Sequence, residues 1–248
     1  MINIEICISS DNLGMLGRQV LAAKTGGAKR VELCSNMHYD GLTPSETAIE
    51  LASSVLTDEQ QLMVMIRPRE GGFHYLKQEI EQIHRSIISA AKCGANGVVF
   101  GLLDASQTEL NINAMKPLVE LARGKGLAVT CHRAFDALLD PVAGLKQLKA
   151  LGVNRVLTAG DKWGQPCLAT DNAQTFSRYL QAVKGDIEII LAGGITPENA
   201  ASIVATQKQT NKELTDYLSL HAYSGVLTDG LVNKHKVARL YSAANNDQ

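Results

Sequence analysis

Short apolar segments rich in β-branched residues alternate with amphipathic helical segments from one end of this chain to the other. Such alternation is typical of repeated strand–helix units whose strands pair in parallel. We predict eight strands, at residues 2–8, 28–34, 61–67, 96–102, 127–133, 153–159, 187–193 and 217–224.

Two architectures accommodate such units: an open doubly wound sheet and a closed barrel. The 248 residues of the chain match the roughly 250 residues typical of one (β/α)8 barrel. An open dinucleotide-binding sheet would carry a GxGxxG motif after its first strand, and the sequence has none there. We therefore predict an α/β fold, a single (β/α)8 TIM-type barrel, as one domain over residues 1–248.

Several helix ends carry sequence signals. The segment 43–46 predicts a helix with Thr43 as its N-cap, and the pairs Asp140-Pro141 and Thr196-Pro197 predict the starts of the fifth and seventh helices. Glycines at 26–27, 94, 124–126 and 152 predict left-handed helix ends just before the next strand. The polar segment 206–213 predicts a solvated helix end and loop.

Composition excludes several classes of protein. A net charge of −1 shows no basic excess of the kind that nucleic-acid binding requires. No basic residue precedes Arg18, so the N-terminus lacks the charged start of a signal peptide. The longest uncharged apolar segment, 93–103, is about half of the roughly 20 residues that span a bilayer. We expect a cytoplasmic protein without nucleic-acid or membrane partners.

The five cysteines form no CxxC pair, which argues against a disulfide framework or a structural zinc site. Free thiols are expected. For Cys93 and Cys167 we expect the role of small hydrophobic residues.

Barrel proteins place their functional sites at the C-terminal ends of the strands. The predicted strand ends and the residues just after them carry a dense set of candidate site residues: Glu5, Cys7, Glu32, Cys34, Arg67, Arg69, His132, Arg133, Asp136, Thr158, Gly193, Gly194, His221 and Ser224.

The acidic and histidine members of this set leave two interpretations open. Glu5 and Glu32 could form internal salt bridges with Arg67 or Arg69, or act in catalysis, because a charge inside an apolar strand is costly unless paired. His132 and His221 could be catalytic or hydrogen-bonded core residues. Asp136 could orient either an imidazole or a guanidinium.

The loop residues leave similar alternatives. Gly193, Gly194 and Ser224 follow the last two strands, where many barrels bind phosphate, or the glycines permit tight turns only. Arg67, Arg69, Arg133 and Thr158 are candidate substrate-binding groups. Cys7 and Cys34 end adjacent strands, which run roughly 4.8 Å apart, so their sulfurs could share a soft metal such as Cu(I).

Six motifs in order resemble the CutC copper-homeostasis family: RVELC at 30–34, GLTPS at 41–45, IRPREGGF at 66–73, CHRAFD at 131–136, VLTAG at 156–160 and AGGI at 192–195. The resemblance implies a cytosolic (β/α)8 barrel that self-associates and binds copper through Cys7 and Cys34. The chain departs from the family pattern at Asp40 and Cys131, and neither change removes a candidate site residue.

Two functions follow from these observations. The first is a copper-homeostasis protein that holds Cu(I) between Cys7 and Cys34 as a two-coordinate dithiolate. The alternative is a barrel enzyme of unknown reaction that acts on a small anionic or phosphorylated metabolite. In that alternative Glu5, Glu32, His132, Asp136 and His221 are the candidate catalytic residues, and the arginines bind the anion.

Overall fold

The strands of the protein form a closed parallel barrel in the computed structural model, which describes residues 1–165 and 168–246. β1 pairs with both β2 and β8, which closes the sheet. All eight strands lie within one residue of the predicted segments, and the predicted (β/α)8 TIM-type barrel is confirmed. The strands are β1 Asn3–Ser9, β2 Arg30–Cys34, β3 Gln61–Met65, β4 Gly97–Val99, β5 Ala128–Cys131, β6 Arg155–Thr158, β7 Glu188–Leu191 and β8 Leu218–Ala222.

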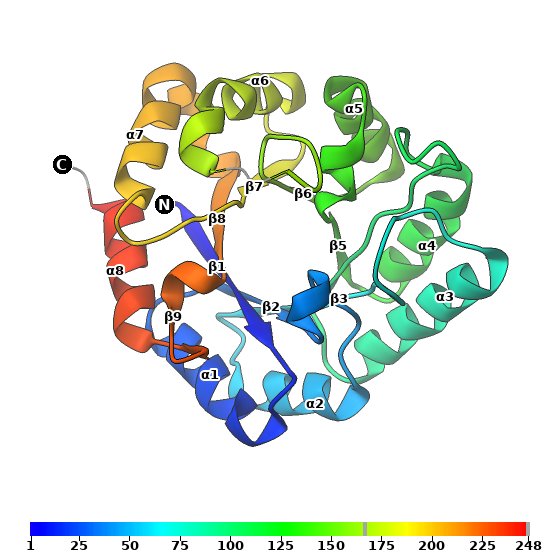
Figure 1. Ribbon diagram of the computed structural model, residues 1–248, viewed down its shortest axis with the longest axis horizontal. Helices are drawn as coiled ribbons and strands as arrows, with labels where there is room; N and C mark the ends of the chain where they lie inside the picture. The colour runs from blue at the N-terminus through cyan, green and yellow to red at the C-terminus, as the bar shows by residue number, and fades with distance from the viewer. Residues whose placement is uncertain (166–167, 247–248) are drawn as a thin grey trace.

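In the described part of the chain, eight α-helices surround the barrel as an outer ring (Figure 1). They are α1 Leu13–Thr25, α2 Glu46–Val55, α3 Lys77–Lys92, α4 Ile112–Gly124, α5 Pro141–Leu151, α6 Ala173–Val183, α7 Ala200–Asn211 and α8 Lys234–Asn245. Short 3-10 helices occupy the loops: η1 Met37–Tyr39, η2 Arg133–Ala137, η3 Ala169–Asn172, η4 Lys212–Tyr217 and η5 Ser224–Val226. Between β8 and α8, β9 Leu227–Thr228 and β10 Leu231–Val232 form a small hairpin.

The alternating orientation of side chains along the strands separates two buried regions, one that packs with the helices and one inside the barrel. In β1, Ile4, Ile6 and Ile8 belong to the large apolar core that also contains the buried helix residues. Glu5 and Cys7 have the opposite orientation, because successive side chains of a strand point to opposite faces, and Cys7 belongs to a separate cluster inside the barrel. Burying an isoleucine contributes about 1.5–3 kcal/mol. The outward face therefore stabilises the fold, and the inward face is available for polar chemistry.

Local signals at the helix starts were partly correct. Asp140 caps α5, because its side chain accepts a hydrogen bond from the Ala143 N–H at 3.0 Å, as predicted. The prediction of Thr43 as the N-cap of α2 is wrong. Ser45 accepts from the Ala48 N–H at 3.3 Å, whereas Thr43 bonds to the backbone of Arg67.

The predicted start of α7 at Thr196-Pro197 and the predicted solvated end at 206–213 are also wrong. The helix begins at Ala200, and Thr196 opens the preceding turn, where its N–H donates to Asn199. The segment 206–213 is not simply solvated, because Gln207 and Asn211 are buried. Gln207 donates to the Ala173 carbonyl at 3.0 Å and thereby joins α7 to α6.

The predicted left-handed glycines are confirmed at Gly27, Gly94, Gly126 and Gly152, whereas Gly26 is right-handed and Gly124 lies within α4. Gly152 shows why glycine is needed at such a helix end. Gly152 ends α5 with φ at 82°, a left-handed conformation that is costly for a side chain with a Cβ. The N–H of the next residue, Val153, then returns to the Leu148 carbonyl. The chain thus leaves the helix and enters β6 within a few residues.

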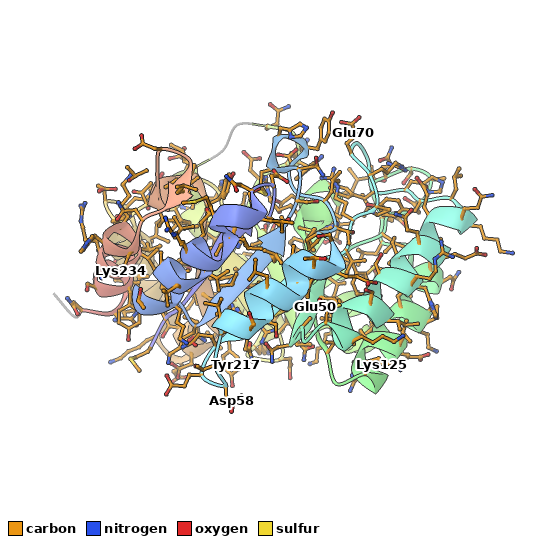
Figure 2. All side chains as sticks on the ribbon, turned by 90° about the horizontal axis from the view of Figure 1, so that it is seen from below. Glu50, Asp58, Glu70, Lys125, Tyr217 and Lys234 are labelled. Carbon is orange, nitrogen blue, oxygen red and sulfur yellow. The ribbon has the colours of Figure 1, made fainter. Side chains whose placement is uncertain are left out.

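The two ends of the barrel differ in their loops (Figure 2). Glu70, which follows β3, lies at one edge of the molecule, and Asp58, Lys125 and Tyr217, which precede β3, β5 and β8, lie at the other. The strand ends predicted to carry the site therefore open at the Glu70 edge. Over the described residues, no helix is both long enough and apolar enough to cross a membrane.

Candidate functional site

A cavity of about 130 Å³ opens at the C-terminal ends of the strands. It takes its walls from most strands and from the loops that follow them. The lining residues are Cys7, Glu32, Cys34, Met37, Asp40, Met65, Arg67, Phe73, His132, Arg133, Leu157, Trp163, His221 and Tyr223. Seven of the candidate residues from the sequence are in this set: Cys7, Glu32, Cys34, Arg67, His132, Arg133 and His221.

A layer of paired charges is buried inside the barrel. Arg30 donates to Glu5 at 2.9 Å and, through both terminal nitrogens, to Glu188 at 2.6 and 2.9 Å. Arg155 donates to the same Glu188 at 3.0 Å. Burial raises the pKa of Glu5, but Arg30 and His221 outweigh burial and lower it to about 2. Glu5 is thus an ionised structural group next to the cavity.

This layer corrects the predicted salt bridges of the two glutamates. Glu5 pairs with Arg30 and His221, and neither Glu5 nor Glu32 pairs with Arg67 or Arg69. Arg69 lies away from the cavity lining, where it forms a salt bridge with Glu79. The prediction failed because it considered only residues at the strand ends and in the loops after them. The partner of Glu5 is instead a residue at the start of β2.

His221 stands between the two glutamates. Its Nδ1 lies 2.8 Å from Glu5 Oε1, and its Nε2 lies 3.7 Å from Glu32 Oε2. Burial opposes charge on the ring, but Glu32, Cys7 and Glu5 raise the pKa of His221 well above its ordinary value. The ring therefore carries a positive charge near neutral pH, and it offsets part of the negative charge around the thiols.

Three sulfur atoms meet at one wall of the cavity. Cys7 Sγ lies 3.8 Å from Cys34 Sγ and 3.9 Å from Met37 Sδ, and both cysteines are buried. The hydrogen bond between Cys7 and Cys34 lowers the pKa of Cys7 to about 6 despite its burial. The same hydrogen bond, together with burial, raises the pKa of Cys34. One oxygen of Glu32 lies close to both thiols, so Cys7, Glu32 and Cys34 could ligate one metal ion.

His132 occupies another wall as a neutral imidazole. Its Nδ1 accepts a hydrogen bond from the Ala134 N–H at 3.1 Å, which assigns the ring proton to Nε2. Burial, with the nearby charge of Arg67, lowers the pKa of His132 to about 3. Nε2 is buried and has no hydrogen-bond partner among the described residues. This atom is a donor that can act on a bound molecule.

Asp136 orients a guanidinium rather than an imidazole, which settles the alternative left open by the sequence. Its carboxylate accepts from Arg133 Nε at 2.8 Å, from the Ala159 N–H at 3.0 Å and from the Thr158 hydroxyl. Arg133 in turn stacks 5.1 Å from the centre of the Trp163 ring. Asp136 and Thr158 thus lie behind the cavity and position Arg133 at its wall.

The predicted phosphate loop residues lie apart from this cavity. Gly193, Gly194 and Ser224 are not among its lining residues. The Gly193 carbonyl accepts from Ala169 and the Gly194 carbonyl from Asn199, and both glycines have positive φ angles of 96° and 66°. These contacts favour the tight-turn interpretation of the two glycines.

Sequence reasoning missed several residues of the cavity. Met37, Phe73 and Trp163 stand in loops, where no periodic pattern marks them. Met37 follows the second strand by only a few residues, and a thioether beside two strand-end thiols is the one signal that could have found it. Cys93 lies at the end of α3 near Glu50 and Cys131 lies in the apolar core, while Cys167 lies outside the described residues.

The fold and this cavity together define a (β/α)8 barrel protein with a buried strand-end cluster of thiol, imidazole and carboxylate groups. The chain belongs to the CutC family, since the sequence model of that family matches residues 2–215.

Named relatives agree with this assignment. A CutC family protein of Vibrio cholerae serotype O1 (strain O395) is 39% identical over 203 residues, which cover 81% of this chain and 74% of that protein. Its counterpart in Vibrio vulnificus (strain YJ016) is 37% identical over 203 residues, with 82% and 76% covered.

Solved structures match the fold. A Streptococcus agalactiae protein, assigned by name to copper homeostasis as CutC, superposes with a TM-score of 0.75 at 28% identity. The match covers 92% of this chain and all of that one. A KDPGal structure superposes with a TM-score of 0.65 at 13% identity, covering 97% and 93%, and this similarity concerns the fold alone.

Proposed function

We propose that this protein binds Cu(I) through Cys7 and Cys34 and serves copper homeostasis. The observation that carries the proposal is a group of three sulfur atoms, two from the buried Cys7 and Cys34 and one from the half-buried Met37. Thiolate and thioether sulfur are the ligands that Cu(I) prefers. The name of the Streptococcus agalactiae structure points to the same role.

From the sequence we expect a two-coordinate dithiolate, and the distances favour a bent arrangement of the two sulfurs over a linear one. With metal–sulfur bonds of about 2.3 Å, two sulfurs 3.8 Å apart subtend an angle of about 110° at the ion. A linear pair would need a separation of about 4.6 Å at the same bond length. A third ligand completes a bent site, and Met37, 3.9 Å from Cys7, supplies a soft one.

An anaerobic titration of the reduced protein with Cu(I) against a competing chelator tests this function. We expect one Cu(I) per chain, lost in the Cys7→Ser/Cys34→Ser variant. Cys93→Ser is the matched control, because that thiol lies at the end of α3 and outside the cavity. If the double variant keeps the stoichiometry and affinity of the wild type, the proposed site is wrong.

The cytoplasmic location and self-association implied by the family resemblance belong to this proposal. The described cysteines at 7, 34, 93 and 131 are all free, which suits a reducing compartment. Sedimentation of the purified protein, and fractionation of cells that express it, test the two parts separately.

A second candidate function is a barrel enzyme that acts on a small anionic metabolite. The observation that favours it is a set of buried polar atoms at the cavity that have no hydrogen-bond partner among the described residues: Glu32 Oε1, Arg67 Nε and His132 Nε2. Buried polar groups are normally hydrogen-bonded, and a catalytic role or a bound group is one explanation of an exception. A thermal-shift screen with organic acids and phosphosugars tests it, because a ligand of the folded state raises the melting temperature.

A further inference from the structure

Arg67 is a buried cation whose charge is not neutralised by a carboxylate. Its side chain is 3% exposed, and its terminal nitrogens donate to the backbone carbonyls of Tyr39, Gly41 and Gly71. In residues 1–165 and 168–246, no carboxylate forms a salt bridge with it. A buried charge is costly unless paired, so this guanidinium favours an anion in the cavity.

The donors on this side of the cavity match an oxygen anion. Arg67 Nε carries a hydrogen and lacks a partner within the described chain, and the same holds for His132 Nε2. The two groups are held against a shared neighbour, because the Arg67 guanidinium lies 5.2 Å and the His132 ring 4.8 Å from the centre of the Phe73 ring. Two fixed N–H donors suit the planar carboxylate group.

The opposite wall offers an acceptor. Glu32 Oε2 lies 3.7 Å from both His221 Nε2 and Cys34 Sγ, while Glu32 Oε1 is buried and has no hydrogen-bond partner in the described part of the chain. A ligand hydroxyl group, which can both donate and accept a hydrogen bond, would satisfy Oε1. The cavity volume of about 130 Å³ is below the roughly 300–1,000 Å³ of pockets for drug-sized ligands.

We infer that this cavity binds a small 2-hydroxy carboxylate, with the carboxylate on Arg67 Nε and His132 Nε2 and the hydroxyl group donating to Glu32 Oε1. Phosphate esters fit less well, because Gly193, Gly194 and Ser224, the residues that could cradle a phosphate, lie outside the lining. The inference deepens the second candidate function and rests on it. It concerns binding alone. If the protein binds such an acid without converting it, the enzymatic function is refuted and the binding site is not.

Calorimetric titration of the reduced, metal-free full chain with lactate, propionate and inorganic phosphate tests the inference. Lactate and propionate share the carboxylate and differ in the hydroxyl group. We expect lactate to bind at least about tenfold more tightly than propionate, and more tightly than phosphate, since propionate leaves the buried Glu32 Oε1 unpaired. Equal affinities, tighter phosphate binding or no lactate binding would overturn it.

Two variants of His132 separate its two nitrogens. His132→Asn keeps an acceptor for the Ala134 N–H and loses the Nε2 donor, whereas His132→Gln places an amide N–H near the position of Nε2. We expect Asn to lower lactate affinity about tenfold or more and Gln to stay within about threefold of the wild type. Wild-type affinity in the Asn variant would overturn the assignment.

These measurements remain decisive if a variant does not fold, because the ratio between lactate and propionate needs only the wild type. They are also separate from the copper proposal. His132 is not one of the three sulfur ligands, so a folded His132→Asn protein is expected to bind Cu(I) as the wild type does. Loss of lactate binding with intact Cu(I) binding supports the anion site.

Discussion

The His132→Asn variant is expected to lose less of its free energy of unfolding on acidification than the wild type does. The imidazole is 3% exposed, and burial beside Arg67 lowers its pKa to about 3. In the unfolded chain a histidine has a pKa of about 6.5. Between these two values the unfolded chain binds a proton that the folded chain does not, so the stability contributed by the neutral ring is complete above about pH 6.5 and falls as pH decreases towards 3.

The magnitude follows from the width of that interval. Each pH unit inside it changes the free energy of unfolding by about 1.4 kcal/mol, so about 2–3 kcal/mol is lost between pH 6.5 and 4.5. Asparagine does not titrate and keeps an acceptor for the Ala134 N–H. Urea unfolding of both proteins at pH 7.5 and 4.5 gives the difference between their acid losses, and Glu5, present in both, cancels from it.

We expect the wild type to lose about 2–3 kcal/mol more than the variant between the two pH values. A pH dependence that is the same in both proteins would show that His132 is not held neutral in the folded state. The assignment of Nε2 as a hydrogen-bond donor would then have to be abandoned.

Three further predictions concern the copper site and the scaffold. Met37→Leu should weaken Cu(I) binding about tenfold without abolishing it, because two thiolates remain, and chelator competition measures this; unchanged affinity would exclude the thioether as a ligand. Arg30→Met should lower the free energy of unfolding by about 3–5 kcal/mol in urea, because it leaves buried carboxylates unpaired; a loss below about 1 kcal/mol would contradict the structural role of the charged layer. Ser45→Ala should lower the free energy of unfolding by about 1 kcal/mol, because α2 loses its N-cap. If Thr43→Ala destabilised α2 as much or more, Thr43 would be the N-cap after all.

The barrel and the strand-end thiols were predictable because both depend on periodic patterns. Alternation along a strand puts Glu5 with Cys7, and Glu32 with Cys34, on the inward faces of neighbouring strands, and the barrel rule places the ends of those strands at one site. The structure brings these residues together with His221 from the last strand. Local periodicity and fold topology were sufficient for this part.

The partners within the site were not predictable, because they depend on register and loop conformation. Glu5 meets Arg30 through the pairing of β1 with β2, and Arg30 stands at the start of its strand, away from the strand ends where the barrel rule places a site. Arg67 donates hydrogen bonds to backbone carbonyls of loops, and no pattern of side chains in the sequence predicts such contacts. Trp163 reaches the cavity from a loop between β6 and η3.

The position of Trp163 has a practical consequence. The chain contains one tryptophan, and its ring lies at the cavity wall, between Arg133 at 5.1 Å and Phe73 at 4.9 Å. The intrinsic fluorescence excited at the tryptophan band therefore comes from a single ring in the lining of the cavity that the sulfur atoms also line. Binding of a ligand in the cavity is therefore expected to change the tryptophan fluorescence, without a label and without a substitution.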